Sequence, residues 1–155
     1  MPLRFSTAGR TAATAANARD VVAQLWNPST DRVLLVREIR LTNTNAAAPH
    51  NRTVVARTTT TGTAGSTVTP DIDNEYSRFA APPSGALLLL ALFSVQPTVD
   101  ATNLELAWYR QEPGAGFVWT YNVPVGVPPA SGLAIINSGG FITTAADVTF
   151  AWDEL

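Results

Sequence analysis

The chain has 155 residues, which is enough for one domain with its own core and too few for two. It contains no cysteine, which excludes disulfides, zinc-thiolate sites and cysteine nucleophiles, so stability must come from core packing or from association. Its net charge is −2 and all ten of its lysine and arginine positions are arginine, so it lacks a basic stripe and we expect no nucleic acid partner. The charged content of 14% leaves more surface suited to burial against neighbours than the roughly 25% usual in soluble domains.

Residues 1–20 show no sustained apolar period of two or of 3.6, and we interpret them as an N-terminal arm in front of a single domain over residues 21–155. A chain terminus is usually disordered unless it is tied down, so we expect a neighbouring subunit to hold the arm. Its candidate contact residues are Leu3, Arg4, Phe5 and Arg10. Two alternatives remain: Leu3 and Phe5 add an edge strand to their own domain, or the Arg-, Ala- and Thr-rich composition marks an organelle transit peptide.

Three strands are expected between residues 21 and 61. The first covers residues 21–26 and ends at the turn formers of residues 27–31, where Pro28 presets φ and removes a hydrogen-bond donor. Residues 33–44 alternate in polarity, but Arg37 breaks the apolar face, which predicts a long strand with a bulge near Arg37. Residues 53–61 are rich in β-branched side chains, which favours a third strand.

The segment 67–86 has no strong strand pattern, and loops of this length inside compact domains are usually functional. Its carboxylates suit pairing with arginine from a neighbouring subunit. We therefore predict subunit contacts at Asp71, Asp73, Glu75 and Tyr76. The alternating acids also match the first positions of a calcium-binding loop. However, Tyr76 occupies the position where an EF-hand loop needs glycine, and Pro82 the position where it needs glutamate. No metal is predicted here, although a calcium site of another kind remains an alternative.

Five further strands are expected, each ended by Pro, Gly, Asn or Asp, at residues 86–95, 104–110, 117–123, 133–137 and 146–152. The most apolar stretch, residues 86–93, is too short to cross a bilayer, so we expect a buried strand and no membrane partner. About eight short strands with regular turns and no helical period predict an all-β fold. Its architecture should be a two-sheet antiparallel β-sandwich of jelly-roll type.

The sequence patterns that are typical of catalytic sites are incomplete in this chain. His50 is the only histidine and lies between two predicted strands, with no Gly-x-Ser-x-Gly elbow in the chain, so we expect a solvated turn residue and not a triad member. The acids Glu38, Glu105 and Glu112 are scattered over separate strands and turns, and nothing brings two of them to one cleft as a glycosidase requires. No enzyme and no cofactor are predicted.

Aromatic side chains offer one further binding chemistry, because their faces can stack on sugars. The candidates are Trp26, Trp108, Tyr109, Trp119, Tyr121 and Trp152. Trp119 and Tyr121 are two residues apart and share one face of a predicted strand, which favours a place in the core.

Several short sequence segments, most of them at predicted turns, resemble those of small virion proteins of tailed bacteriophages. They are Leu-Trp-Asn-Pro-Ser at 25–29, Thr-Pro-Asp-Ile-Asp-Asn at 69–74, Ala-Pro-Pro-Ser-Gly at 81–85, Val-Pro-Pro-Ala-Ser-Gly-Leu-Ala at 127–134 and Val-Thr-Phe-Ala-Trp-Asp-Glu at 148–154. The resemblance covers about residues 25–154. It implies a jelly-roll-like sandwich placed on a phage particle.

The function that this resemblance implies is a capsid decoration or cement subunit, which binds and stabilises the lattice of the major capsid protein. A homo-oligomer is expected, and a trimer would suit the three-fold positions of a capsid. Its location would be the capsid surface of the virion, after assembly in the host cytoplasm. The alternative is a receptor- or carbohydrate-binding module of a tail or fibre. Exposed Trp and Tyr at one loop end would favour sugar binding, whereas an apolar, weakly charged side surface would favour the lattice role.

Overall fold

The computed structural model describes residues 3–11, 20–44, 50–68, 71–72, 84–90, 93–110, 112–139 and 145–155. Every secondary-structure element in these residues is a strand, and all the pairings between them are antiparallel. The strands are β1 (Leu3–Arg10), β2 (Val21–Asn27), β3 (Leu34–Asn43), β4 (His50–Thr58), β5 (Ser66–Val68), β6 (Asp71–Ile72), β7 (Leu87–Leu90), β8 (Val99–Arg110), β9 (Gly116–Val127), β10 (Ser131–Gly139) and β11 (Ala146–Glu154). The predicted all-β class is confirmed.

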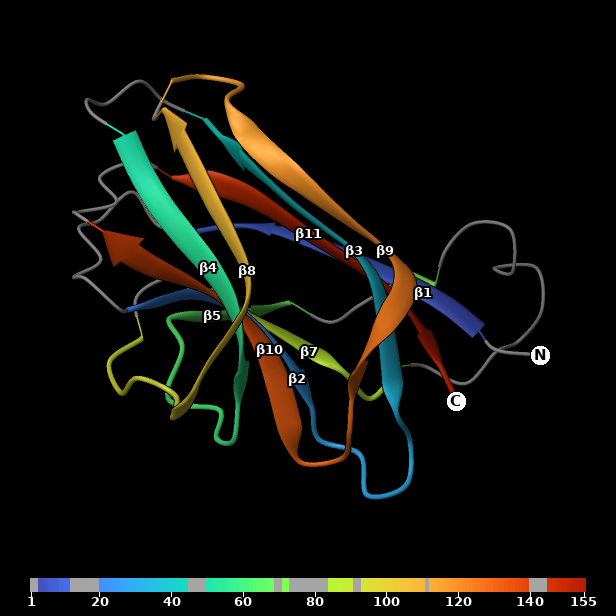
Figure 1. Ribbon diagram of the computed structural model, residues 1–155. Coiled ribbons are helices and arrows are strands. Elements are labelled where there is room, and N and C mark those ends of the chain that lie inside the picture. The colour runs from blue at the N-terminus through green and yellow to red at the C-terminus, as the bar shows by residue number, and fades with distance from the viewer. Residues whose placement is uncertain are drawn as a thin grey trace.

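Two sheets pack face to face, so the fold is the predicted β-sandwich (Figure 1). The five-stranded sheet has the order β6-β1-β11-β3-β9, and the six-stranded sheet has the order β5-β7-β2-β10-β4-β8. Eight of these strands follow a jelly-roll order, with β1-β11-β3-β9 facing β2-β10-β4-β8. The short strands β5, β6 and β7 are inserted between β4 and β8 in the chain. β7 lies within the strand predicted at residues 86–95, whereas β5 and β6 lie at the start of the segment 67–86, for which no strand was predicted.

The main core fills the space between the sheets. Its largest side chains with less than 2% exposure are Trp152, Phe5, Phe150, Leu25, Leu34, Ile39, Leu41, Leu88, Leu90, Leu133 and Ile135. They come from both sheets and alternate along each strand with side chains on the opposite face, as the period of two requires. Burial of this apolar surface is the main force that holds the two sheets together.

The N-terminal segment is the main difference from the expected organisation. Residues Leu3–Arg10 form β1, which pairs residue by residue with β11 and lies inside the five-stranded sheet, so the predicted arm over residues 1–20 does not describe this part. The alternative of a strand added to the chain's own domain is right about the strand, but β1 lies between β6 and β11 and not at the edge of the sheet. The reason is that Phe5 and Thr7 alternate into the buried face while Arg4 and Ala8 point outward, and a single large apolar residue suffices to anchor so short a strand. Residues 12–19 lie outside the described residues.

Strand β3 contains the predicted bulge. Its register shifts at Arg37 against both neighbours, so Arg37 is left without a pairing partner on β9 and on β11. On β9, residues 121–124 lie opposite this single residue, because Glu38 pairs with Thr120 and Val36 with Val125. The bulge explains why β9 runs on through Pro124, where the sequence indicates a turn: a proline is tolerated at a bulge of an edge strand.

A second apolar cluster covers the outer face of the six-stranded sheet. Its buried members are Val21, Val54, Ala56, Leu89, Phe93, Ala134 and Ile136. The connections that follow β4 and β7 lie over this face and contact each other. Thr63 and Val95 form an isolated β-bridge, and Thr98 N donates a hydrogen bond of 2.8 Å to Thr60 Oγ1. The middle of the six-stranded sheet is therefore covered on both faces.

Candidate functional site

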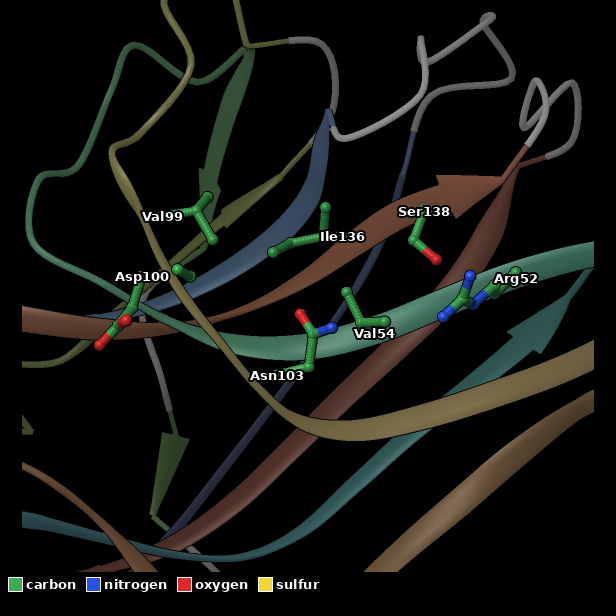
Figure 2. A pocket seen from close by; sticks show the side chains of 8 residues that line it. Arg52, Val54, Val99, Asp100, Asn103, Ile136 and Ser138 are labelled. Atoms are coloured by element: carbon green, nitrogen blue, oxygen red, sulfur yellow. The ribbon is translucent and has the colours of Figure 1, made fainter.

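A pocket of about 650 Å³ lies on the outer face of the six-stranded sheet (Figure 2). This volume is within the range of pockets that bind small ligands. The lining residues come from β4, β8 and β10: Arg52, Val54, Val99, Asp100, Ala101, Asn103, Ile136 and Ser138.

The floor of the pocket is apolar because it is part of the second cluster. Val54 and Ile136 are register partners on β4 and β10, and both are almost fully buried. Val99 packs against the same cluster at the start of β8. The pairing of β8 with β4 shifts twice between Val55 and Thr58, so the first half of β8 departs from a regular ladder beside the pocket.

Polar groups lie at the two ends of the pocket. Figure 2 shows Arg52 and Ser138 at one end, with the Ser138 hydroxyl pointing toward Arg52, and Asp100 at the other end. The Ser138 Oγ is buried, and no hydrogen-bond partner for it lies within the described residues. Asp100 Oδ1 accepts a hydrogen bond of 3.2 Å from the backbone N–H of Thr102. The pocket can hold a polar ligand over an apolar floor, but no base stands beside Ser138 among the lining residues to activate it.

The basic residues predicted as contacts form ion pairs within the chain. Arg10 donates two hydrogen bonds to Asp147, its direct partner on β11, from Nε at 2.7 Å and from Nη2 at 3.0 Å. These bonds, with the charge of Arg10, hold the pKa of Asp147 below its ordinary value. Arg4 pairs with Asp153 at 3.3 Å, and Arg37 binds the other oxygen of the same carboxylate. Both arginines remain partly exposed on the outer face of the five-stranded sheet.

The apolar residues predicted as contacts have different outcomes. Phe5 is fully buried in the main core, so it is not available to another subunit. Leu3 pairs through its backbone with Glu154, and its side chain lies outside the described residues. In the loop, Asp71 belongs to β6 and pairs with Ser6, whereas Asp73, Glu75 and Tyr76 lie outside the described residues.

The candidate catalytic residues occupy separate elements. His50 begins β4, and its side chain is outside the described part of the structure. Glu38 lies on β3 and pairs with Arg40 at 2.5 Å, Glu105 lies on β8, and Glu112 lies between β8 and β9. Among the described residues, no group of three or more His, Cys, Asp or Glu is placed to hold a metal ion.

Strands β8 and β9 form a second candidate surface, which we call the open side. They are consecutive in the chain but belong to different sheets, and each is the last strand of its sheet. Of the five exposed large hydrophobic residues found in the described part of the chain, three lie here, with Leu106 47%, Val118 58% and Val123 83% exposed. These three side chains are candidates for contact with another protein.

The aromatic residues of β9 line the inner face of the open side. Trp119 and Tyr121 are half-buried and pack against the main core. Phe117 packs there as well, and the centroid of its ring lies 3.8 Å from that of Trp119. Burial raises the pKa of the Tyr121 hydroxyl, and the nearby charge of Glu105 raises it further. The side chains of Trp108 and Tyr109 are outside the described residues.

Sequence reasoning missed the pocket because its residues come from three strands whose order cannot be read from periodicity. Ser138 follows the predicted strand at residues 133–137 and Asp100 precedes the predicted strand at residues 104–110, and these positions are the signal that the sequence carries. The open side was also missed. The signal there was the absence of any charged residue between residues 116 and 127.

Comparison of the chain with protein family models, with curated proteins and with solved structures finds no match. Within the described residues, no helix is long and apolar enough to span a membrane. The pocket and the open side are the two features of the structure that bear on function.

Proposed function

We propose that the chain is a non-catalytic assembly subunit that binds its partners through the open side of the sandwich. The observation that carries the proposal is that three of the five exposed large hydrophobic side chains in the described residues, Leu106, Val118 and Val123, lie on the two edge strands β8 and β9. Such exposed apolar side chains on a weakly charged protein favour burial against another protein.

We further propose that the assembly is a bacteriophage capsid, with the major capsid protein as the partner. The resemblance of the short sequence segments to those of phage virion proteins supports this proposal, and a jelly-roll sandwich is a fold that capsid proteins use. The subunit would act by binding energy alone, at the surface of the virion, after assembly in the host cytoplasm. A homo-oligomer would increase its avidity for a lattice of repeated sites.

Co-sedimentation with heads of tailed bacteriophages tests this proposal. Heads stripped of their surface proteins should carry the chain into the pellet, in saturable amounts. The Val123→Lys variant should lose most of this binding, because it places a charge on the open side. The matched control is Val95→Lys, at an exposed valine outside the open side, which should co-sediment as the unmodified chain does. Equal loss in both variants, or no binding to any head, would contradict the proposal.

A carbohydrate-recognition module is the second candidate, and the pocket of Figure 2 is the observation that favours it. Its polar ends suit sugar hydroxyls, but its lining contains no aromatic ring to stack on a sugar face. Calorimetric titration with host glycans would detect such binding. A titration signal that Asn103→Ala abolishes, together with failure to bind heads, would favour this second function.

A further inference from the structure

The two sides of the sandwich end differently. On one side, the sheets as far as they are described end in β5 and β6, which have three and two residues. Very short edge strands are one of the ways in which proteins prevent unwanted pairing with other chains. On the open side, the sheets end in β8 and β9, which have twelve residues each. Long edge strands present unpaired backbone N–H and C=O groups to any extended segment.

The two long edges differ in their protection. Strand β8 carries three charged side chains, Asp100, Glu105 and Arg110, and its register shifts twice. Strand β9 carries no charge at all, and its proline and bulge are confined to residues 121–124. Its first part, Gly116–Thr120, pairs regularly with β3 and contains no charge, proline or bulge. β3 is its only strand neighbour within the described residues. This five-residue segment is thus an unprotected edge.

We propose that Gly116–Thr120 pairs antiparallel with the same segment of a second copy of this chain, about a two-fold axis at Val118. The pairing would join the two five-stranded sheets into one continuous sheet. In this register, Val118 faces its own copy, Phe117 faces Trp119, and Gly116 faces Thr120. The two Val118 side chains, each 58% exposed in the isolated chain, would cover each other.

Charge favours a second copy over a different partner. A two-fold axis brings each residue close to its own copy, so any charged residue near the axis repels itself. β9 has no such residue, whereas β8 would bring like charges together. The inner-face pairs match as well, because Phe117 and Trp119 would form aromatic cross-strand pairs on both sides of the axis. The contact is small, so we expect a weak dimer that forms with rising concentration.

Sedimentation equilibrium of the full chain over a wide concentration range is the first test. The expected result is a mass that rises from one chain to two. Val118→Lys should hold the mass at one chain, because it adds an edge charge that faces its own copy. Val95→Lys is a closely matched control, since Val95 is a valine with 59% exposure outside β9, and it should dimerise normally.

A cysteine scan tests the register directly, because the chain has no cysteine of its own. Under mild oxidation, Val118→Cys should form a covalent dimer efficiently, since residues on the axis face each other at disulfide distance. Val95→Cys should not. Efficient cross-linking at Val95, or none at Val118, would overturn the register.

Other outcomes separate this inference from the proposed function. A monomer at every concentration, or the trimer that the sequence analysis predicts, would overturn the two-fold pairing. If that chain still co-sediments with phage heads, the proposed function stands. A dimer with the expected response to Val118→Lys supports the pairing even if no head is bound.

Discussion

Phe5 stacks on Trp152, with ring centroids 6.0 Å apart and ring planes inclined by 20°. The two residues are register partners on β1 and β11, the first and last strands of the chain. Both side chains are fully buried in the main core. The stack therefore joins the two ends of the chain at the centre of the sandwich.

The first prediction concerns this stack. Phe5→Ala should lower the free energy of unfolding by about 3–5 kcal/mol, because it removes a buried ring and leaves a cavity beside Trp152. Denaturant unfolding followed by tryptophan fluorescence measures the change. Ser6→Ala, one residue along β1 on the outer face, should change stability by less than about 0.5 kcal/mol. Equal stability of Phe5→Ala and the unmodified chain would mean that β1 is a dispensable arm after all.

The strand β1 shows where sequence reasoning reached its limit. Strands with several large apolar residues, such as β3 and β11, were predicted from their alternation, and so was the bulge at Arg37. β1 has one large residue whose burial the structure establishes, Phe5, and its remaining stability comes from a ladder with β11, in which Arg4 lies opposite Asp153, 149 positions away. Pairing between strands so far apart in sequence leaves no pattern in the residues of β1 itself, because the stability of the strand depends on its partner β11.

The second prediction compares two aspartates of β11. The Asp153 side chain is only 6% exposed and binds Arg4 and Arg37. Asp153→Asn should cost about 1–3 kcal/mol, since it removes a buried charge from two charge-assisted contacts. Asp147→Asn is the matched variant on the same strand, where the pair with Arg10 is exposed, and it should cost no more than about 1 kcal/mol. Thermal unfolding of both variants measures the two losses of stability. An equal loss in Asp153→Asn and Asp147→Asn would contradict the difference in burial between the two aspartates.

The third prediction is a pH dependence with a fixed sign. Because the pKa of Asp147 is lower in the folded chain than its ordinary value of 3.8, the unfolded chain binds the proton more readily. The contribution of the pair is therefore present above pH 3.8 and is lost as the pH falls through the lower folded pKa. The unfolding free energy of Asp147→Asn should decline less steeply in this acidic range. An unchanged slope would show that Arg10 does not hold this carboxylate in solution.

The fourth prediction concerns the Tyr121 hydroxyl, which is buried without a hydrogen-bond partner among the described residues. Removing an unpaired polar group is neutral or favourable, so Tyr121→Phe should change stability by between zero and about 1 kcal/mol in the stabilising direction. The raised pKa adds a second signature: above pH 10.0 the hydroxyl ionises only in the unfolded chain, so stability falls as the pH rises. Tyr121→Phe should weaken this alkaline loss. Destabilisation at neutral pH would reveal a partner for the hydroxyl.

The candidate surfaces were less predictable than the fold for a physical reason. Arg52 and Ser138 are 86 residues apart in sequence, and they line one pocket only because β4 and β10 are neighbours in the sheet. Their types are ordinary for strand ends, so no spacing marks them. The predicted contact residues Arg4 and Arg10 form ion pairs with Asp153 and Asp147 of the same chain, because β1 lies beside β11.

The last prediction concerns the start of β9, where the backbone lies very close to β3. A Cβ atom on Gly116 would lie 1.8 Å from the carbonyl oxygen of Leu41, which is backbone and cannot turn aside as a side chain can. Gly116→Ala must therefore push β9 away from β3, at a cost of about 1–3 kcal/mol for the overpacking. Gly85→Ala is the control, because its Cβ would meet no atom within 4 Å, and it should not destabilise the chain. The displaced strand should also dimerise less, so a Gly116→Ala variant with unchanged stability and unchanged mass would contradict the close approach of the two strands.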